Sequence, residues 1–240
     1  MKLVYIYHSG FVIEGTGFSI LIDYYRDTSH ESGKGYVHEV WLKRPGRLYV
    51  LCSHVHADHY NPEILTWRQV RPDIHYILSK DIRSAIKEST ENLVFLDKLD
   101  SFRDDLLELK AFGSTDAGIS FLINAEGKRI FHAGDLNNWH WNEESSPEES
   151  RGYENAFLKE LKILKEETDY VDLAMFPVDA RLGKDYMKGA TQFIEHIRTG
   201  CFAPMHFWEK YDKAAAFGEI ARSRGCRFIA WTRPGESIDF

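Results

Sequence analysis

Residues 53–59 concentrate the side chains that could carry out chemistry. They read Ser-His-Val-His-Ala-Asp-His, which places three imidazoles and one carboxylate within six positions. Imidazole and carboxylate are ligands that zinc, iron and manganese take in proteins. On an extended segment His54 and His56 project to the same side, while Asp58 and His59, after the chain turns, can face a second point. The loop therefore predicts a metal site with room for two ions.

A buried strand is expected to position this loop. Arg47–Cys52 is a continuous apolar run of strand length that stops at the polar Ser53, and such runs are typical of strands buried on both faces. Ligand sites of α/β folds lie in loops outside the carboxyl ends of such strands, because the strand is rigid and the loop faces a crevice. The chemistry is thus expected where this strand ends.

The rest of the chain alternates strand and helix signals. Apolar runs separated by turn residues predict an antiparallel meander over 3–7, 11–13 and 18–22. Further strands are expected at 74–78, 93–96, 106–109, 119–123, 128–132, 171–176 and 228–231, and helices at 62–70, 81–87, 153–164, 193–197 and 212–224. These elements predict an α/β (α+β) protein whose sheets are covered by helices. Because no linker divides the chain, one domain spanning residues 1–240 is expected.

Composition excludes several classes of protein. Hydrophobic residues make up 43% and charged residues 28% of the chain, which is typical of a globular protein and not of a disordered or coiled-coil one. A net charge of −7 and the lack of a basic run argue against nucleic acid as a partner. No apolar run approaches the roughly 18 residues of a membrane helix, and the first residues read as a strand, not a signal peptide. Cys52, Cys201 and Cys226 read as buried, reduced thiols, and a cytoplasmic protein is expected.

Four motifs, in their order along the chain, resemble the metallo-β-lactamase fold superfamily of metal-dependent hydrolases. They are a strand ending in Asp at Leu21-Ile22-Asp23, the His54–His59 loop, Gly134-Asp135 after a strand, and a late Pro204-Met205-His206. The resemblance spans nearly the whole chain and implies a four-layer αβ/βα sandwich. His8-Ser9-Gly10-Phe11 at the first hairpin is most similar to the branch of L-ascorbate-6-phosphate lactonase and the N-acyl-phosphatidylethanolamine phospholipase D type enzymes.

The resemblance also implies a set of metal ligands. These are His54 and His56 on a first ion, Asp58, His59 and His206 on a second, and Asp135 bridging both. The family usually supplies a third imidazole to the first ion, but the matching residues 111–118 contain no His. Three readings stay open: Asp116 is an oxygen ligand instead, the first site is weak or vacant, or His8 swings in from its turn. We favour Asp116, which would move the preference of that site from zinc toward manganese or iron.

The activity implied by the resemblance is hydrolysis with one or two divalent ions, zinc foremost and manganese or iron as alternatives. Two ions about 3.5–4 Å apart can lower the pKa of a water toward about 7, and the metal-bound hydroxide would cleave an ester, lactone, amide or phosphodiester bond of a small molecule. Asp58 would be both a ligand and a proton acceptor. The alternatives are a phosphodiesterase or nuclease, and a non-hydrolytic redox or sensor protein on the same fold, which a ligating Asp116 would suit.

Two further residues are candidates for catalytic roles. By the resemblance, Asp23 would bond the metal loop from behind and fix the tautomer of a histidine, and its alternative role is to cap a turn. His8 lies in a tight turn and would be a general acid or a substrate contact, or would simply cap the hairpin.

The substrate candidates lie after two later strands. Trp139 and Trp141 would wall a pocket or pack under the following loop. Arg181 would receive an anionic group of the substrate or pair with Asp179. His132 is expected in the core, and the expected surface histidines are His30, His38, His75, His140 and His196.

Overall fold

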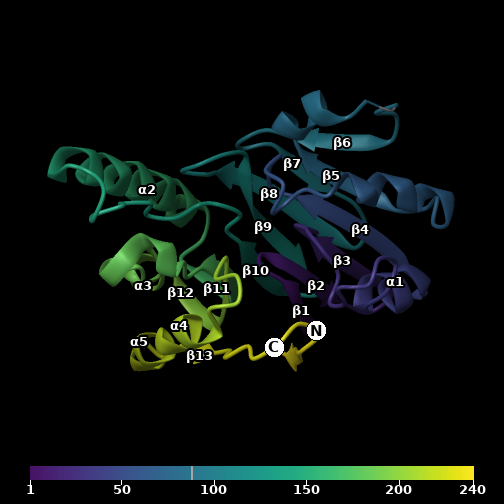
Figure 1. Ribbon diagram of the computed structural model, residues 1–240. Helices are drawn as coiled ribbons and strands as arrows, with labels where there is room; N and C mark the ends of the chain where they lie inside the picture. Colours follow the sequence, from purple (N-terminus) through teal and green to yellow (C-terminus); the bar gives the residue numbers. More distant parts are fainter. Residues whose placement is uncertain (88) are drawn as a thin grey trace. The chain divides into compact units, whose positions relative to one another are not determined.

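The computed structural model describes residues 1–87 and 89–240. The chain forms two compact units, one comprising Met1–Asp97 and Thr232–Phe240, and the other Lys98–Trp231. Each unit contains one seven-stranded mixed sheet (Figure 1). The mixed α/β class is confirmed, whereas one domain over residues 1–240 stays a prediction.

The first unit has mostly parallel strands on one side of its sheet and antiparallel strands on the other. Its elements are β1 (Lys2–Tyr7), β2 (Gly10–Glu14), β3 (Phe18–Ile22), α1 (Tyr36–Glu39), the 3₁₀ helix η1 (Trp41–Lys43), β4 (Arg47–Cys52), η2 (Pro62–Gln69), β5 (His75–Ser79), η3 (Lys80–Ala85), β6 (Leu93–Leu96) and β14 (Ser237–Asp239). The strand order is β14-β1-β2-β3-β4-β5-β6. Pairs up to β2–β3 are antiparallel, and those from β3–β4 onward are parallel.

The second unit repeats this plan. Its elements are β7 (Ser101–Arg103), β8 (Leu107–Gly113), β9 (Ile119–Ala125), β10 (Lys128–His132), α2 (Pro147–Glu167), β11 (Tyr170–Pro177), η4 (Ala180–Asp185), α3 (Lys188–His196), β12 (Arg198–Met205), α4 (Tyr211–Ala216), α5 (Gly218–Ser223) and β13 (Arg227–Phe228). The order is β13-β12-β11-β10-β9-β8-β7. The pairs from β7 to β10 are antiparallel and those from β10 to β13 parallel.

Strand direction explains where the candidate residues gather in the first unit. β1 and β3 run the same way because each is antiparallel to β2, and β4 is parallel to β3. The carboxyl ends of these three strands therefore lie at one edge of the sheet. His8 follows β1, Asp23 follows β3, and the loop 53–60 follows β4.

The same logic applies within the second unit. β10, β11 and β12 are neighbouring parallel strands, so the residues after them share one edge of that sheet. Asp135 follows β10, Asp179 follows β11, and His206 follows β12. The turn that carries Asp116 lies at the same edge, because β8 runs parallel to β10 through the antiparallel β9.

Apolar packing holds each unit together. In the first unit Trp41 and Trp67 pack with Tyr24 and the inner residues of β4 and β5. In the second unit, the ring of Phe176 stacks on Phe193 of α3 and also contacts Phe157 of α2. Burial of such aromatic side chains is the main favourable contribution to folding.

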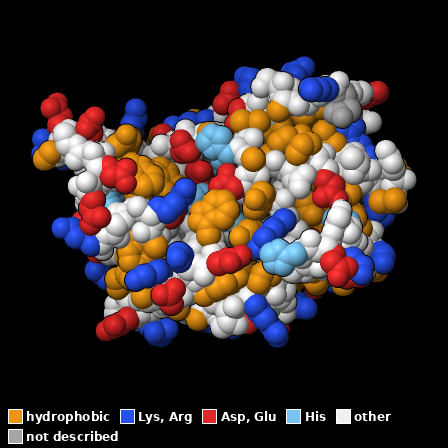
Figure 2. Space-filling model, in the orientation of Figure 1, with side chains coloured by type: hydrophobic (Ala, Val, Ile, Leu, Met, Phe, Trp, Pro, Cys, Tyr) orange, Lys and Arg blue, Asp and Glu red, His pale blue; other side chains and the backbone are white. Residues whose placement is uncertain are grey.

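The surface and the thiols agree with a globular chain. On the face drawn in Figure 2, acidic and basic side chains are interspersed. Among the described residues, no helix has the length and apolarity needed to cross a bilayer. All three cysteines are free and buried, as expected.

Candidate metal centre

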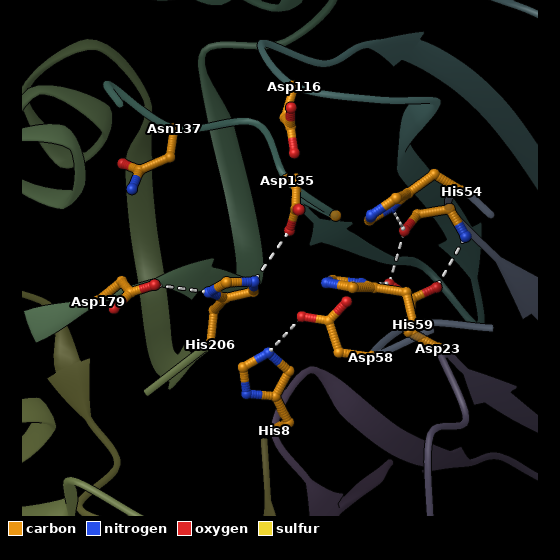
Figure 3. Close-up of polar contacts among 12 residues, drawn as sticks. His8, Asp23, His54, Asp58, His59, Asp116, Asp135, Asn137, Asp179 and His206 are labelled. Atoms are coloured by element: carbon orange, nitrogen blue, oxygen red, sulfur yellow. Dashed lines mark hydrogen bonds and ion pairs between the residues drawn. The ribbon is translucent and has the colours of Figure 1, made fainter. Parts of the chain in front are cut away.

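The loop after β4 is held in place by the buried carboxylate of Asp23. One oxygen, Oδ1, accepts the backbone N–H of Ser53 at 2.7 Å. The other, Oδ2, accepts the Ser53 hydroxyl at 2.7 Å and lies 2.7 Å from Nδ1 of His59. All three residues are fully buried. The structure thus brings Asp23 behind the loop (Figure 3).

These hydrogen bonds set the tautomers of two imidazoles. His59 donates from Nδ1 to the carboxylate, so in the neutral ring Nε2 carries the lone pair. Because the Ser53 hydroxyl donates its hydrogen to Asp23, the Ser53 oxygen accepts a hydrogen bond from Nδ1 of His54 at 2.9 Å. In both rings, the nitrogen that could ligate a metal is therefore Nε2. This arrangement, in which an outer carboxylate orients imidazoles, is the usual support of metal-binding histidines.

The thiol of Cys52 adds a second support to the loop. Its Sγ lies 3.4 Å from the carbonyl oxygen of His54 and 3.3 Å from that of His59. Burial raises the pKa of this thiol well above its ordinary value, and the nearby Asp23 raises it further. Cys52 is consequently a neutral donor to the loop and not a thiolate.

His8 lies close to the second half of the loop. Its Nε2 is 3.3 Å from Oδ2 of Asp58, and its ring meets that of His59 edge-on, with centroids 5.9 Å apart. One ligand atom from each of these three residues lies within 4.8 Å of the others. The ring of His54 lies close to the rings of both His56 and His59, with centroids 4.6 Å and 4.1 Å apart.

In the second unit, His206 lies between two carboxylates (Figure 3). Its Nδ1 is 2.9 Å from Oδ2 of Asp179, and its Nε2 is 3.4 Å from Oδ1 of Asp135. Both carboxylates are buried. Asp179 therefore orients His206 as Asp23 orients His59, and Nε2 of His206 is directed toward Asp135.

Arg181 holds Asp179 in this role. Its backbone N–H and its guanidinium donate to the carboxylate over 2.5–3.1 Å. Burial by itself would raise the pKa of Asp179, but the hydrogen bonds from His206 and Arg181 outweigh it and bring the pKa to about 2. Asp179 is thus ionised at any working pH. The pairing of Arg181 with Asp179 is one of the two roles expected from the sequence.

Asp116 lies on the exposed turn between β8 and β9. Figure 3 shows its carboxylate pointing toward Asp135. The neighbouring Thr115 bonds this turn to the loop after β10: its hydroxyl donates to the carbonyl of Asn137 at 2.5 Å and accepts the N–H of Asn137 at 2.9 Å. The turn is therefore tied to the segment that carries Asp135, and Asp116 as a ligand stays a prediction.

The two tryptophans differ in exposure. Trp139 is buried, donates from Nε1 to the backbone oxygen of Asp135 at 2.8 Å, and packs edge-on against His206. Trp141 is partly exposed and stacks on Trp139 at 6.3 Å between centroids. Trp139 thus packs against His206 and bonds to the backbone of Asp135, and of the two tryptophans Trp141 is the more accessible.

The histidines outside the loop differ from expectation at His140 and, in part, at His38 and His196, which are only partly exposed. His132 is buried, as expected, and His30 and His75 are exposed. His140, expected at the surface, is fully buried, because its ring is fixed between the N–H of Asn142 and the backbone oxygen of Asp185. One of these partners, Asp185, is 45 residues away in the sequence, so the local sequence gives no sign of it.

Comparison with known proteins agrees with this geometry. A family model described as a beta-lactamase superfamily domain matches residues 2–150. The chain belongs to the beta-lactamase superfamily. Along the whole length, it is 25% identical, over an alignment of 253 residues, to a UPF0173 metal-dependent hydrolase of Symbiobacterium thermophilum; the match covers 99% of each protein.

Two solved structures with a fold similar to that of this chain extend the comparison. One is Igni18, a metallo hydrolase of Ignicoccus hospitalis, with a TM-score of 0.68, 17% identity, and coverage of 100% of this chain and 98% of that one. The other is CmlA, a diiron β-hydroxylase of Streptomyces venezuelae, with a TM-score of 0.69, 14% identity, and coverage of 100% and 54%. At these identities the likeness concerns the fold alone. The metallo-β-lactamase fold expected from the sequence is confirmed.

Proposed function

We propose that this chain, a metal-dependent hydrolase of the beta-lactamase superfamily, cleaves an ester, lactone, amide or phosphodiester bond of a small molecule at a centre of one or two divalent ions. The proposed ligands are His54, His56, Asp58, His59, Asp135 and His206, with Asp116 as an additional oxygen donor. The observation that carries the proposal is the hydrogen-bonded set around Asp23, because it leaves Nε2 of two imidazoles as the ligating atom.

The donor set fits a divalent ion of the zinc, manganese or iron type. Imidazole nitrogens and carboxylate oxygens are the ligands that these metals share. When bound, such ions make water acidic enough to attack at neutral pH and polarise the bond under attack. Zinc is our first choice because imidazoles outnumber carboxylates in the loop.

The protein's own residues would do the positioning. Asp23 and Asp179 hold His59 and His206 in one tautomer each. Asp58, whose side chain is 25% exposed, would serve both as a ligand and as a proton acceptor. Trp139 would shield His206 from water, since its ring packs edge-on against the imidazole.

Substrate contacts would come from two exposed groups near the second-unit residues. The free face of Trp141 would stack on an apolar or sugar-sized group. Arg181, whose side chain is 51% exposed, would receive an anionic group while it keeps its bonds to Asp179. The three reduced cysteines support a cytoplasmic location.

A redox centre is the second candidate function. Two observations favour it: the fold similarity to the diiron protein CmlA, and the lack of an imidazole in residues 111–118, which leaves Asp116 as the candidate third ligand. A carboxylate-rich first site would suit iron.

Metal analysis followed by assays separates the two functions. We expect the purified protein to bind up to two zinc or manganese ions, and to hydrolyse at least one compound in a panel of chromogenic esters, lactones and phosphodiesters. Asp135→Asn should lower metal content and hydrolysis together. An iron centre whose absorption bleaches on reduction, without hydrolysis of any compound, would support the redox function instead.

A further inference from the structure

His8 has a backbone conformation that few non-glycine residues adopt. Tyr7 pairs with Gly10, so His8 and Ser9 form a two-residue hairpin turn. The φ angle of His8 is 57°, a left-handed conformation that is uncommon outside Gly and in which Asn, Asp and His are the enriched residues; two-residue hairpin turns themselves prefer Gly, Asn or Asp. Strained residues of this kind persist where the surrounding structure and the function require the side chain. The turn therefore adopts an uncommon backbone conformation at the residue that carries the imidazole.

The imidazole is also fixed in place. The backbone N–H of His8 donates to the hydroxyl of Tyr5 at 3.0 Å, and the His8 side chain is fully buried. The ring meets His59 edge-on and presents Nε2 to Asp58 (Figure 3). All of these residues belong to the first unit. Their arrangement is thus set by the β1–β2 turn and the loop after β4.

The separation of the two atoms matches the edge of a metal coordination shell. Two donors, each about 2.05 Å from a tetrahedral ion, lie about 3.3–3.4 Å apart. Nε2 of His8 and Oδ2 of Asp58 are 3.3 Å apart. Ligand atoms of His8, Asp58 and His59 lie within 4.8 Å of one another, close enough for one ion to reach all three.

We propose that His8 is a protein ligand of the ion that Asp58 and His59 hold. This inference rests on the proposed function, which assigns Asp58 and His59 to a metal. With His206 assigned to the same ion and Asp135 shared by both ions, the ligand set becomes three imidazoles and two carboxylates, all of them side chains that zinc takes as ligands. His8 is then excluded as the substitute for the missing third imidazole of the His54 and His56 ion.

An unequal pair of sites follows from this assignment. The ion at His8 has the richer nitrogen donor set. The ion at His54 and His56 would depend on Asp135 and Asp116 for its remaining protein ligands. We therefore expect the full chain to bind one zinc ion tightly and a second more weakly, so that dialysis against a mild chelator leaves one.

The test uses the full chain, stripped with a chelator and titrated with Zn²⁺ and with Co²⁺. His8→Asn is the main variant, because Asn adopts φ above zero readily and keeps the turn. His75→Asn, at an exposed position of the same unit, is the matched control. We expect His8→Asn to weaken the tight site beyond the roughly 10–100-fold loss typical of removing an outer partner of a ligand, and to alter the visible Co²⁺ spectrum. The control should change neither.

The outcomes separate the inference from the function on which it rests. An unchanged affinity and Co²⁺ spectrum in His8→Asn, with wild-type binding intact, would overturn the role of His8 alone. If the wild-type chain bound neither ion, the proposed function itself would fail. Should His8→Asn not fold, ¹¹³Cd-loaded wild-type protein with ¹⁵N-labelled histidine gives the answer: a cadmium–nitrogen coupling at His8 supports the assignment, and its absence beside a coupled His59 overturns it.

Discussion

At the scale of single residues, one carboxylate organises much of the candidate metal centre. Asp23 has a φ of 48° and is fully buried, and it reaches His59 directly and His54 through Ser53. A buried carboxylate is costly unless it is fully hydrogen-bonded, and here the partners are the residues that the proposed function needs. We therefore propose that Asp23 positions ligands.

Replacing Asp23 by Asn should weaken metal binding. The Asn amide carries no negative charge and has one acceptor oxygen in place of two, so it cannot accept all the hydrogen bonds that Asp23 receives from Ser53 and His59. We therefore expect metal affinity to fall roughly 10–100-fold. Competition with a chromophoric chelator measures the change. Asp27→Asn is the control, because Asp27 is also buried but accepts from His38 and the start of α1. Equal losses in the two variants would mean that Asp23 acts only through stability.

Residue-level prediction from the sequence succeeded for the local motif and failed for partners brought in by strand pairing. The spacing within residues 53–59 is visible in the sequence, and so was Asp23 at the end of a strand. The contact of Asp179 with His206 is not visible in the sequence, because it depends on the pairing of β11 with β12, which brings together residues 27 positions apart. The contact of Cys52 with the loop was missed because a lone apolar cysteine carries no signal.

At the scale of elements, His38 connects the short helix α1 to η2. Its Nδ1 lies 2.8 Å from Asp27 and its Nε2 2.8 Å from Glu63. Burial lowers the pKa of His38, but the hydrogen bonds to the two carboxylates outweigh it and raise the pKa above its ordinary value. This histidine was expected at the surface, and the structure makes it a cationic bridge between elements.

The stability contributed by this bridge should depend on pH. Because the pKa is raised in the folded state, the contribution is complete below about pH 6.5, the unfolded value, and is lost as pH rises through the folded pKa. We expect His38→Gln to lower the free energy of unfolding by roughly 1–3 kcal/mol at pH 6 and by less at pH 8.5. Urea denaturation at both pH values measures it, with His75→Gln as the control. A penalty that grows with pH would contradict the assignment.

Element boundaries followed local signals where these were strong. The helix expected over 153–164 is α2, which begins earlier, at Pro147, because Ser146 and Glu149 form a capping box there; Phe157, Leu161 and Leu164 form its buried face as the stripe predicted. Tyr153, assigned to the same stripe, is 42% exposed because it lies in the part of the helix before that face is covered. The expected helix over 212–224 starts after Lys210 and is divided at Phe217 into α4 and α5. Phe217 is fully buried, and tertiary packing of its ring is invisible in a propensity pattern.

At the scale of the whole molecule, each unit supplies part of the proposed ligand set from one edge of its own sheet. The two sheets share a plan of antiparallel strands followed by parallel ones. This repetition was not detectable in the sequence, because the two halves share no repeated motif. The mixed α/β class was predictable from the alternation of elements alone.

Metal should stabilise the whole chain. A ligand that binds only the folded state, at 100 times its Kd, adds about 2.7 kcal/mol, which corresponds to roughly 5–10 °C in Tm for a chain of this size. We expect Zn²⁺ to raise the Tm of chelator-treated protein by this amount, as followed by scanning fluorimetry, and Mg²⁺ to raise it less. Asp135→Asn should show a smaller zinc effect. If that variant kept the full shift, Asp135 would not be a ligand.

The short terminal strand β14 has a consequence for biosynthesis. It pairs with β1, so Lys2 lies opposite Asp239, and the Met1–Asp97 unit is completed by Thr232–Phe240. During translation the edge of β1 that β14 will cover has no partner strand while the 134 residues of the Lys98–Trp231 unit are synthesised. A chain truncated before Thr232 would thus carry an open, aggregation-prone hydrogen-bonding edge at β1.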